Sequence, residues 1–185
     1  IDASHPFARE VSLNAGKACK QAGVPYIRFE RPKATIKDAH IIKVRNFEEA
    51  ALKANTFKGN IFLTIGSNNL KPFIDKVGNY ENRLFVRVLP DSKVLAKCEK
   101  IGLSPNSIIA VKGPFSTKMN TQMLEHCKAG VMVTKDSGIA GGTVEKLNAA
   151  GRLGIPVILV QRPHMKYSKK ADSINQVIEF VKTVV

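Results

Sequence analysis

The sequence predicts an α/β protein with mostly parallel β-sheets. Short apolar runs of strand length alternate with longer stretches in which apolar residues recur every three or four positions. Strands joined by helical crossovers in this way lie parallel to one another. The clearest unit is residues 131–163, where an apolar run, a polar loop, a helix-length segment and a second apolar run follow in order.

The other elements follow from the same two periodicities. Residues 1–8 read as a strand end that leads into a helix, because the apolar stripe of Phe7, Val11, Ala15, Ala18 and Ala22 comes next. Further strands are predicted at residues 24–30, 40–44, 60–65, 84–89, 107–112, 131–134 and 156–160. Helices are predicted at or around residues 46–54, 70–77, 94–101, 119–127, 143–153 and 174–181.

We expect two domains, divided where Pro90-Asp91-Ser92 forms a turn and a helix N-cap. The predicted domains are residues 1–89 and residues 90–185. The chain begins at Ile1 inside a predicted strand, so we expect the first lobe to be incomplete at its amino terminus. A glycine-rich phosphate loop after the first strand of that lobe would then precede Ile1.

Composition excludes several classes of protein. Of the 185 residues, 44% are hydrophobic, as in ordinary globular proteins, and no apolar run approaches the ~18 residues of a membrane span. The three cysteines are far apart and lack metal-ligand spacing, which favours a reducing cytoplasm and no metal site.

The formal net charge of +14 indicates an anionic partner: nucleic acid, a phosphate-bearing cofactor or a polycarboxylate. The alternative is a solvated, lysine-rich surface. The lysines are scattered and only 6% of residues are aromatic, which weakens the case for nucleic acid. A small polyanion fits better.

Polar and basic residues recur where strands end, and ligands of parallel sheets bind at that edge. The cluster at residues 135–142 contains Gly138, Gly141 and Gly142, which fit either a tight turn or a backbone that approaches an anion. Each such residue alone could be a cap, a turn or a ligand. Together they predict a basic cleft between two lobes. No nucleophile elbow or nucleoside-triphosphate loop is present, and these residues alone name no reaction.

Seven short motifs follow one another along the chain: Asp2-Ala-Ser-His-Pro-Phe-Ala8, Arg28-Phe-Glu-Arg-Pro32, Leu63-Thr-Ile-Gly-Ser67, Arg87-Val-Leu-Pro90, Gly113-Pro-Phe115, Thr134-Lys-Asp-Ser-Gly138 and Arg162-Pro163. They stand in the order seen in the precorrin-6A and cobalt-precorrin-6A reductases of cobalamin biosynthesis, and the chain resembles this family from Ile1 to about Pro163.

The resemblance implies two Rossmann-like lobes and NADPH-dependent reduction of one carbon–carbon double bond in a polycarboxylated tetrapyrrole. It implies a cytoplasmic enzyme without a nucleic-acid, membrane or obligatory protein partner. The carboxylates of such a substrate would account for the positive charge. The alternative is a non-catalytic α/β module that binds a nucleotide or another polyanion.

The resemblance also implies roles for single residues. His5 and Lys135 are the expected catalytic residues, and Gly66 and Ser67 lie on the cofactor side. The expected substrate-binding residues are Ser4, Arg28, Lys112, Gly113, Pro114, Phe115, Ser137 and Gly138.

Overall fold

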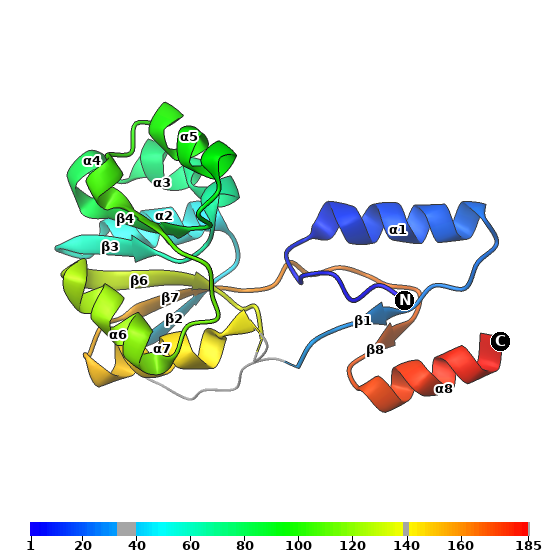
Figure 1. Ribbon diagram of the computed structural model, residues 1–185. Coiled ribbons are helices and arrows are strands. Elements are labelled where there is room, and N and C mark those ends of the chain that lie inside the picture. The colour runs from blue at the N-terminus through cyan, green and yellow to red at the C-terminus, as the bar shows by residue number, and fades with distance from the viewer. Residues whose placement is uncertain (33–39, 139–140, 185) are drawn as a thin grey trace.

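A computed structural model describes residues 1–32, 40–138 and 141–184. Most of the strands form one parallel sheet of six, in the order β2-β7-β6-β3-β4-β5 (Figure 1). The bounds are β2 (Ile41–Val44), β3 (Asn60–Leu63), β4 (Leu84–Val88), β5 (Ile108–Ala110), β6 (Ala129–Lys135) and β7 (Val157–Val160). We refer to this sheet and the helices that cover it as the larger lobe.

Helices cover both faces of the six-stranded sheet. The helices of this lobe are α2 (Phe47–Asn55), α3 (Lys71–Lys76), α4 (Tyr80–Arg83), α5 (Ser92–Lys100), α6 (Thr117–His126) and α7 (Thr143–Arg152), with 3-10 turns η1 (Ser67–Asn69) and η2 (Pro105–Ser107). Helices α2, α3 and α5 lie on one face, and α6 and α7 lie on the other (Figure 1).

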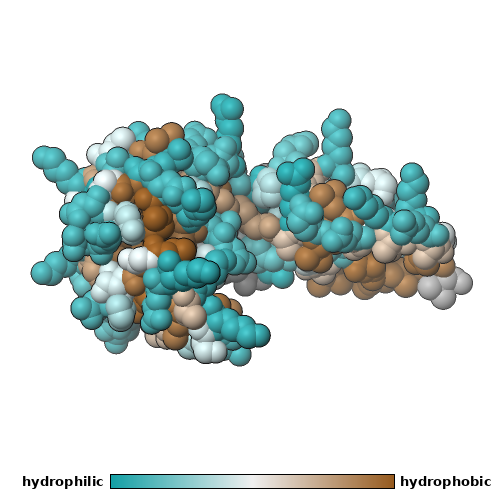
Figure 2. All heavy atoms as spheres, turned by 90° about the horizontal axis from the view of Figure 1, so that it is seen from above, coloured by the Kyte–Doolittle hydropathy of each residue, from teal (hydrophilic) through white to brown (hydrophobic). Residues whose placement is uncertain are grey.

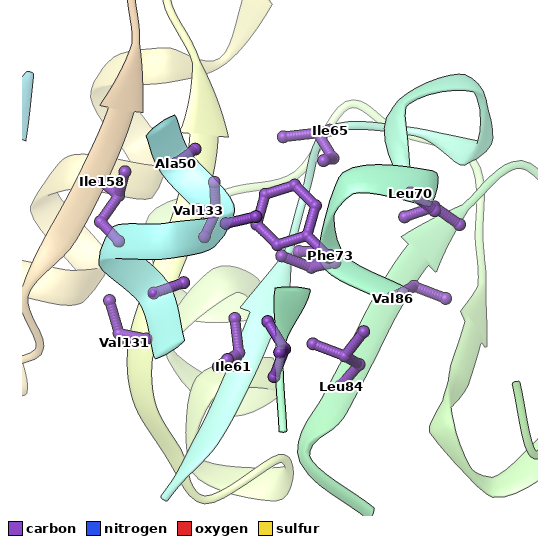
Figure 3. Packing of buried hydrophobic residues seen from close by; sticks show 14 of the residues in the cluster. Ala50, Ile61, Ile65, Leu70, Phe73, Leu84, Val86, Val131, Val133 and Ile158 are labelled. Carbon is purple, nitrogen blue, oxygen red and sulfur yellow. The ribbon is translucent and has the colours of Figure 1, made fainter. Parts of the chain in front are cut away.

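The hydrophobic core follows the alternation of side chains along each strand. Ile61 and Leu63 of β3 belong to the cluster under α2 and α3, whereas Phe62 between them belongs to the cluster under α6 and α7. Figure 3 shows the ring of Phe73, from α3, among side chains of the sheet and of α2. Strands covered on both faces explain why the sequence shows continuous apolar runs.

The remaining elements form a smaller lobe. It contains α1 (Arg9–Gln21), β1 (Arg28–Phe29), β8 (Lys170–Ala171) and α8 (Ile174–Val184), and β1 pairs with β8 in parallel. Ile27, Ala171 and Phe180 form its small core. The chain leaves this lobe after β1 and returns to it after β7, and Figure 2 shows the larger lobe at the left and the smaller lobe at the right.

The predicted class, α/β with mostly parallel sheets, is confirmed. The predicted division into residues 1–89 and 90–185 is corrected. Strand β4 precedes that boundary and β5 follows it, yet the two pair with each other, and β3 pairs with β6. The division in the structure instead separates the two ends of the chain from its middle.

Strand β8, helix α4 and the two 3-10 turns were not predicted. The strand predicted at residues 24–30 forms a strand only at Arg28–Phe29. In the part of the chain that the structure describes, no helix combines the length and the apolar character needed to cross a membrane.

Candidate functional site

A cleft of about 560 Å³ opens beyond the carboxyl ends of β3, β4, β5 and β6. Strands β4 and β5 continue the sheet on one side of β3, and the chain then returns to place β6 on the other side. This reversal of direction is where parallel α/β sheets bind ligands. The cleft is lined by Thr64, Gly66, Arg87, Val88, Leu89, Val111, Gly113, Pro114, Phe115, Asn120, Ser137, Gly141, Gly142, Glu145 and Lys146.

The cleft therefore belongs to the larger lobe alone. A basic cleft between the two lobes was expected from the sequence, but the residues that line this cleft run from residue 64 to residue 146. Lys135, the last residue of β6, lies outside the lining of this cleft.

Arg87 is the first of two buried cations in the cleft. Arg87 belongs to β4 and is only 8% exposed, although it is charged. Its Nη1 donates a hydrogen bond of 2.8 Å to Oδ1 of Asn120. The amide of Asn120 donates in turn to the carbonyl of Ser116, which orients its oxygen toward Arg87. Burial lowers the pKa of Arg87 to about 10, so the side chain is cationic at neutral pH.

Aromatic packing holds the Arg87 guanidinium in place. The guanidinium carbon lies 4.2 Å from the centroid of the Phe115 ring and 5.7 Å from that of Phe62. A Cβ atom on Gly113 would lie 3.0 Å from the Phe115 ring, so a glycine lets this ring fold back over its own loop. The Gly113-Pro-Phe115 segment thus contributes to the cleft partly by supporting Arg87.

Lys146 is the second buried cation, on the first turns of α7. Lys146 is 7% exposed, and among the described residues its ammonium has no hydrogen-bonding or ion-pairing partner. Burial and, after it, the charges of Arg87 and Lys135 lower its pKa to about 8. The neighbouring Glu145 lines the same cleft, and its buried Oε2 likewise has no hydrogen-bond partner in the described part of the chain.

The loop before α7 depends on glycine at defined points. Gly138 has φ +77°, and a Cβ atom there would lie 2.7 Å from both Nη2 of Arg162 and the carbonyl oxygen of Pro32. A Cβ atom on Gly141 would collide with the side chain of Ser137. These glycines let the loop lie against its neighbours, as a tight turn requires. Residues 139–140 of the predicted polar loop lie outside the described residues.

Arg162 joins this loop to the connection between the lobes. Its guanidinium donates to the carbonyl oxygen of Arg31 at 2.6 Å and to that of Asp136 at 3.1 Å. It also forms an ion pair of 3.4 Å with the Asp136 carboxylate. The Arg162-Pro163 motif therefore ties the strand ends to the chain leaving the smaller lobe.

His5 and Lys135, the expected catalytic residues, are brought together at this junction. The ammonium of Lys135 lies 5.5 Å from the centroid of the Phe7 ring, and the His5 ring lies 5.9 Å from the same ring. Burial lowers the pKa of Lys135. Burial, followed by the charges of Lys135, Arg31, Lys146 and Arg162, lowers the pKa of His5 to about 4.

His5 is consequently neutral near pH 7. Its Nδ1 accepts a hydrogen bond of 3.2 Å from the backbone N–H of Phe7, which leaves the proton of the neutral ring on Nε2. A neutral imidazole is a hydrogen-bond donor but a very weak acid. The geometry therefore suits His5 for orienting a ligand better than for delivering a proton.

Arg28 and Ser4, expected to bind substrate, lie in a different place. Arg28 is 1% exposed, and its guanidinium donates to Oδ1 of Asp2 at 2.7 Å and to Oγ of Ser4 at 2.8 Å. It also lies 5.7 Å from the ring centroid of Tyr167. Neither Arg28 nor Ser4 lines the cleft. Their visible role is to hold the first residues of the chain against β1.

Some of the other expected site residues line the cleft and some do not. Gly66, Gly113, Pro114, Phe115 and Ser137 line the cleft. Ser67 begins η1 just beyond the lining, Lys112 is exposed outside it, and Gly138 lies behind the loop against Arg162. The structure thus gathers the strand ends of the larger lobe and leaves the Arg28 network apart.

Lys146, Glu145 and Asn120 line the cleft but were not predicted from the sequence as site residues. Arg87 stands in one of the family motifs, but no binding or catalytic role was predicted for it. The sequence does contain a feature that could have identified each of the two cations as a buried charge. Arg87 interrupts an apolar strand, and Lys146 falls within the buried positions of α7, between Thr143 and Leu147. A charged residue at a core position is rarely buried unless it is paired or bound to something.

Comparison with known proteins shows close relatives. Residues 1–182 match the family model described as precorrin-6x reductase CbiJ/CobK. The chain is 40% identical to the cobalt-precorrin-6A reductase of Methanothermobacter thermautotrophicus, with 98% of this chain and 60% of the relative covered. It is 37% identical to the cobalt-precorrin-6A reductase of Priestia megaterium, over 96% of this chain and 70% of the relative.

Solved structures agree. A structure titled CobK precorrin-6A reductase superposes with a TM-score of 0.77 at 28% identity, over 98% of this chain and 71% of that chain. The chain therefore spans between 60% and about 71% of the length of these relatives.

Proposed function

The chain belongs to the precorrin-6x reductase CbiJ/CobK family, and on this premise we propose that it serves in NADPH-dependent reduction of a polycarboxylated tetrapyrrole. The substrate class is that of precorrin-6A or cobalt-precorrin-6A, and the pathway is cobalamin biosynthesis. In the reaction, NADPH gives a hydride to one carbon of a C=C bond, and a proton adds to the neighbouring carbon. NADP⁺ and the dihydro product leave.

The observation that carries the proposal is the open cleft at the carboxyl ends of β3 to β6. It lies where parallel sheets bind cofactors and substrates, and it is lined on several sides by short family motifs that are far apart in the sequence. Gly66 belongs to one of these motifs, Gly113 to another and Ser137 to a third. A purely structural role would not require these motifs to face a shared open space.

Charge supports an anionic substrate. His5 and Lys146 both have a lowered pKa, first because they are buried and then because surrounding cations repel an added proton. A positive potential therefore extends from His5 through Lys135 to Lys146 and Arg87. A substrate with several carboxylates would neutralise it, and steering by such a field speeds the association of anions.

Within this proposal, the residues take separate tasks. Gly66 and Ser67 approach the cofactor with their backbone, since the chain at Gly66 has φ +76° and no neighbouring atom within 4 Å of where a Cβ would be. Lys135 carries a cation next to the cleft, and neutral His5 donates a hydrogen bond. The cofactor supplies the hydride, while these residues orient the reacting groups and stabilise charge.

The test is direct turnover. Precorrin-6A and its cobalt complex are each incubated with the protein and NADPH, while loss of NADPH absorbance and the mass of the tetrapyrrole are followed. We expect the macrocycle to gain two hydrogen atoms, one of them deuterium when the cofactor is deuterated at C4. Tight binding of NADPH or the tetrapyrrole without any turnover would instead favour a non-catalytic polyanion-binding module.

A further inference from the structure

We infer that Arg87 and Lys146 together form a subsite for one oxyanion, a carboxylate or a phosphate, in the cleft of the larger lobe. The inference rests on the proposed function only for the source of that oxyanion. A carboxylate would come from the tetrapyrrole, and a phosphate would come from the nicotinamide cofactor.

Arg87 has donors to spare. Within the described part of the chain, its hydrogen bonds use Nη1 alone, toward Asn120 and toward the sulfur of Met123 at 3.4 Å. Among the described residues, Nε and Nη2 make no hydrogen bond, although the residue is 8% exposed and lines the cleft. Because Phe115 and Asn120 fix the plane of the guanidinium, its remaining N–H groups are presented in a set direction. A fixed pair of donors is well suited to a planar or tetrahedral oxyanion.

Lys146 has no partner at all within the described part of the chain. Among the described residues no ion pair joins its ammonium to the neighbouring carboxylate of Glu145, whose charge offsets the burial of Lys146 only in part. A buried cation without a partner destabilises the fold, and the charge of Arg87 in the same cleft adds to that cost. An oxyanion between the two cations would remove both penalties.

Two further features fit an oxyanion in this position. The amino-terminal end of α7, at Gly142, opens on the same cleft, and the helix dipole there favours negative charge. The unpartnered Oε2 of Glu145 can accept a hydrogen bond from an N–H or O–H group attached to the same ligand. The subsite thus fits an oxyanion that stands close to a hydrogen-bond donor.

The experiment uses Lys146→Met and Arg87→Gln, with Lys93→Met as the matched control. Lys93 is an exposed lysine at the start of α5, so its variant loses the same charge without touching the cleft. Dissociation constants are measured by calorimetry for three probes: NADPH, NADH and uroporphyrin, a stable tetrapyrrole with eight carboxylates. Loss of a hydrogen bond to a charged group, about 1.5–3 kcal/mol, corresponds to binding that is roughly 10–150-fold weaker.

The probe that is affected identifies the source. Weaker binding of uroporphyrin assigns the subsite to a substrate carboxylate. Weaker binding of NADPH with NADH unchanged assigns it to the 2′-phosphate, and equal weakening of both nucleotides assigns it to the pyrophosphate. If both cleft variants bind all three probes as the Lys93→Met control does, the inference is overturned.

Stability separates a binding role from a structural one. Lys146→Met replaces an unpaired buried charge with an apolar chain of similar length, so we expect a higher melting temperature together with weaker binding. Arg87→Lys serves as a second variant if Arg87→Gln does not fold.

The subsite and the proposed function can fail separately. A wild-type protein that turns over its substrate while the variants bind normally would refute the subsite and leave the proposed function intact. Variants with weaker uroporphyrin or nucleotide binding in a protein that reduces nothing would support the subsite and refute the function.

Discussion

Nη1 of Arg28 lies 2.7 Å from Oδ1 of Asp2, in an ion pair whose side chains are 1% and 5% exposed. The same nitrogen donates to Ser4 and Ser12, and the other oxygen of Asp2 accepts from the Tyr26 hydroxyl at 2.7 Å. Burial alone would raise the pKa of Asp2, but hydrogen bonds to its carboxylate from Ser12, Ser4 and Tyr26 outweigh burial and lower it. The network joins the amino-terminal segment, α1 and β1 into one unit.

We expect Arg28→Met to destabilise the protein by about 3–5 kcal/mol, because it leaves the Asp2 carboxylate buried without its cation. Denaturant unfolding measures this change. Since Arg28 does not line the cleft, the dissociation constant for uroporphyrin should remain within about twofold of the wild-type value in the fraction that stays folded. A stable variant with much weaker binding would make Arg28 a ligand residue, as the family resemblance implies.

We expect Gly138→Ala to be more harmful than Gly66→Ala. Both glycines have a positive φ, +77° and +76°, which residues with a side chain rarely adopt, so each alanine carries a backbone penalty of about 1–3 kcal/mol. At Gly138 the new Cβ would also lie 2.7 Å from Arg162 and the Pro32 carbonyl, whereas at Gly66 it would meet nothing within 4 Å. Thermal and denaturant unfolding of the two variants compares them directly. Equal losses of stability would show that the close packing around Gly138 is unimportant.

The free energy of unfolding should fall as the pH drops from 6.5 to about 4, because the pKa of His5 differs between the unfolded and the folded protein. Its pKa is about 4 in the folded protein and 6.5 in the unfolded chain, so the unfolded state binds more protons between these values. The free energy of unfolding is therefore full above pH 6.5 and declines as the pH falls toward 4, by roughly 1–2 kcal/mol after solvent screening. Urea titrations at several pH values measure the slope.

His5→Asn is the matched control for this pH dependence. Asparagine keeps an oxygen that can accept from the Phe7 N–H but does not titrate, so the slope between pH 6.5 and 4 should become flatter. Asp2 does not confuse the comparison, because both proteins contain it and its lowered pKa produces most of its loss of stability as the pH falls through and below its ordinary value of 3.8. An unchanged slope in His5→Asn would mean that other groups cause the dependence.

For Lys135, we expect Lys135→Ala to reduce turnover while the fold is retained. The side chain is half-buried, burial lowers its pKa, and among the described residues no acidic side chain pairs with it. Loss of its interaction with an ionised ligand group costs about 1.5–3 kcal/mol, or roughly 10–150-fold in kcat/KM. Steady-state kinetics and a melting curve are both needed. Unchanged kinetics with a lower melting temperature would make Lys135 structural.

Binding of an anionic tetrapyrrole should weaken as ionic strength rises, because salt screens partly exposed charges. Titration of uroporphyrin at several salt concentrations measures this effect. Lys146→Met and Arg87→Gln should each show a shallower dependence than Lys93→Met. A flat response in the wild-type protein would contradict the role given to the positive cleft.

Local sequence pattern was enough to predict most of the elements and the end of the sheet at which the site lies. Apolar periodicity located the strands of the larger lobe and its helices other than α4, because side chains buried on both faces of a sheet leave continuous apolar runs. Parallel strands bring their carboxyl ends to one edge, so the convergence of Gly66, Gly113 and Ser137 followed from local pattern.

Which strands pair and which charges are buried could be seen only in the folded protein. The pairing of β1 with β8 joins residues 28–29 to residues 170–171, and nothing in either short segment encodes a partner so distant in the chain. The burial of Lys146 and Arg87 depends on packing by α6, α7 and the Phe115 loop. Pairing and burial are properties of several segments at once, whereas periodicity is a property of one segment, and this is why the division of the lobes and the two buried cations emerged only from the fold.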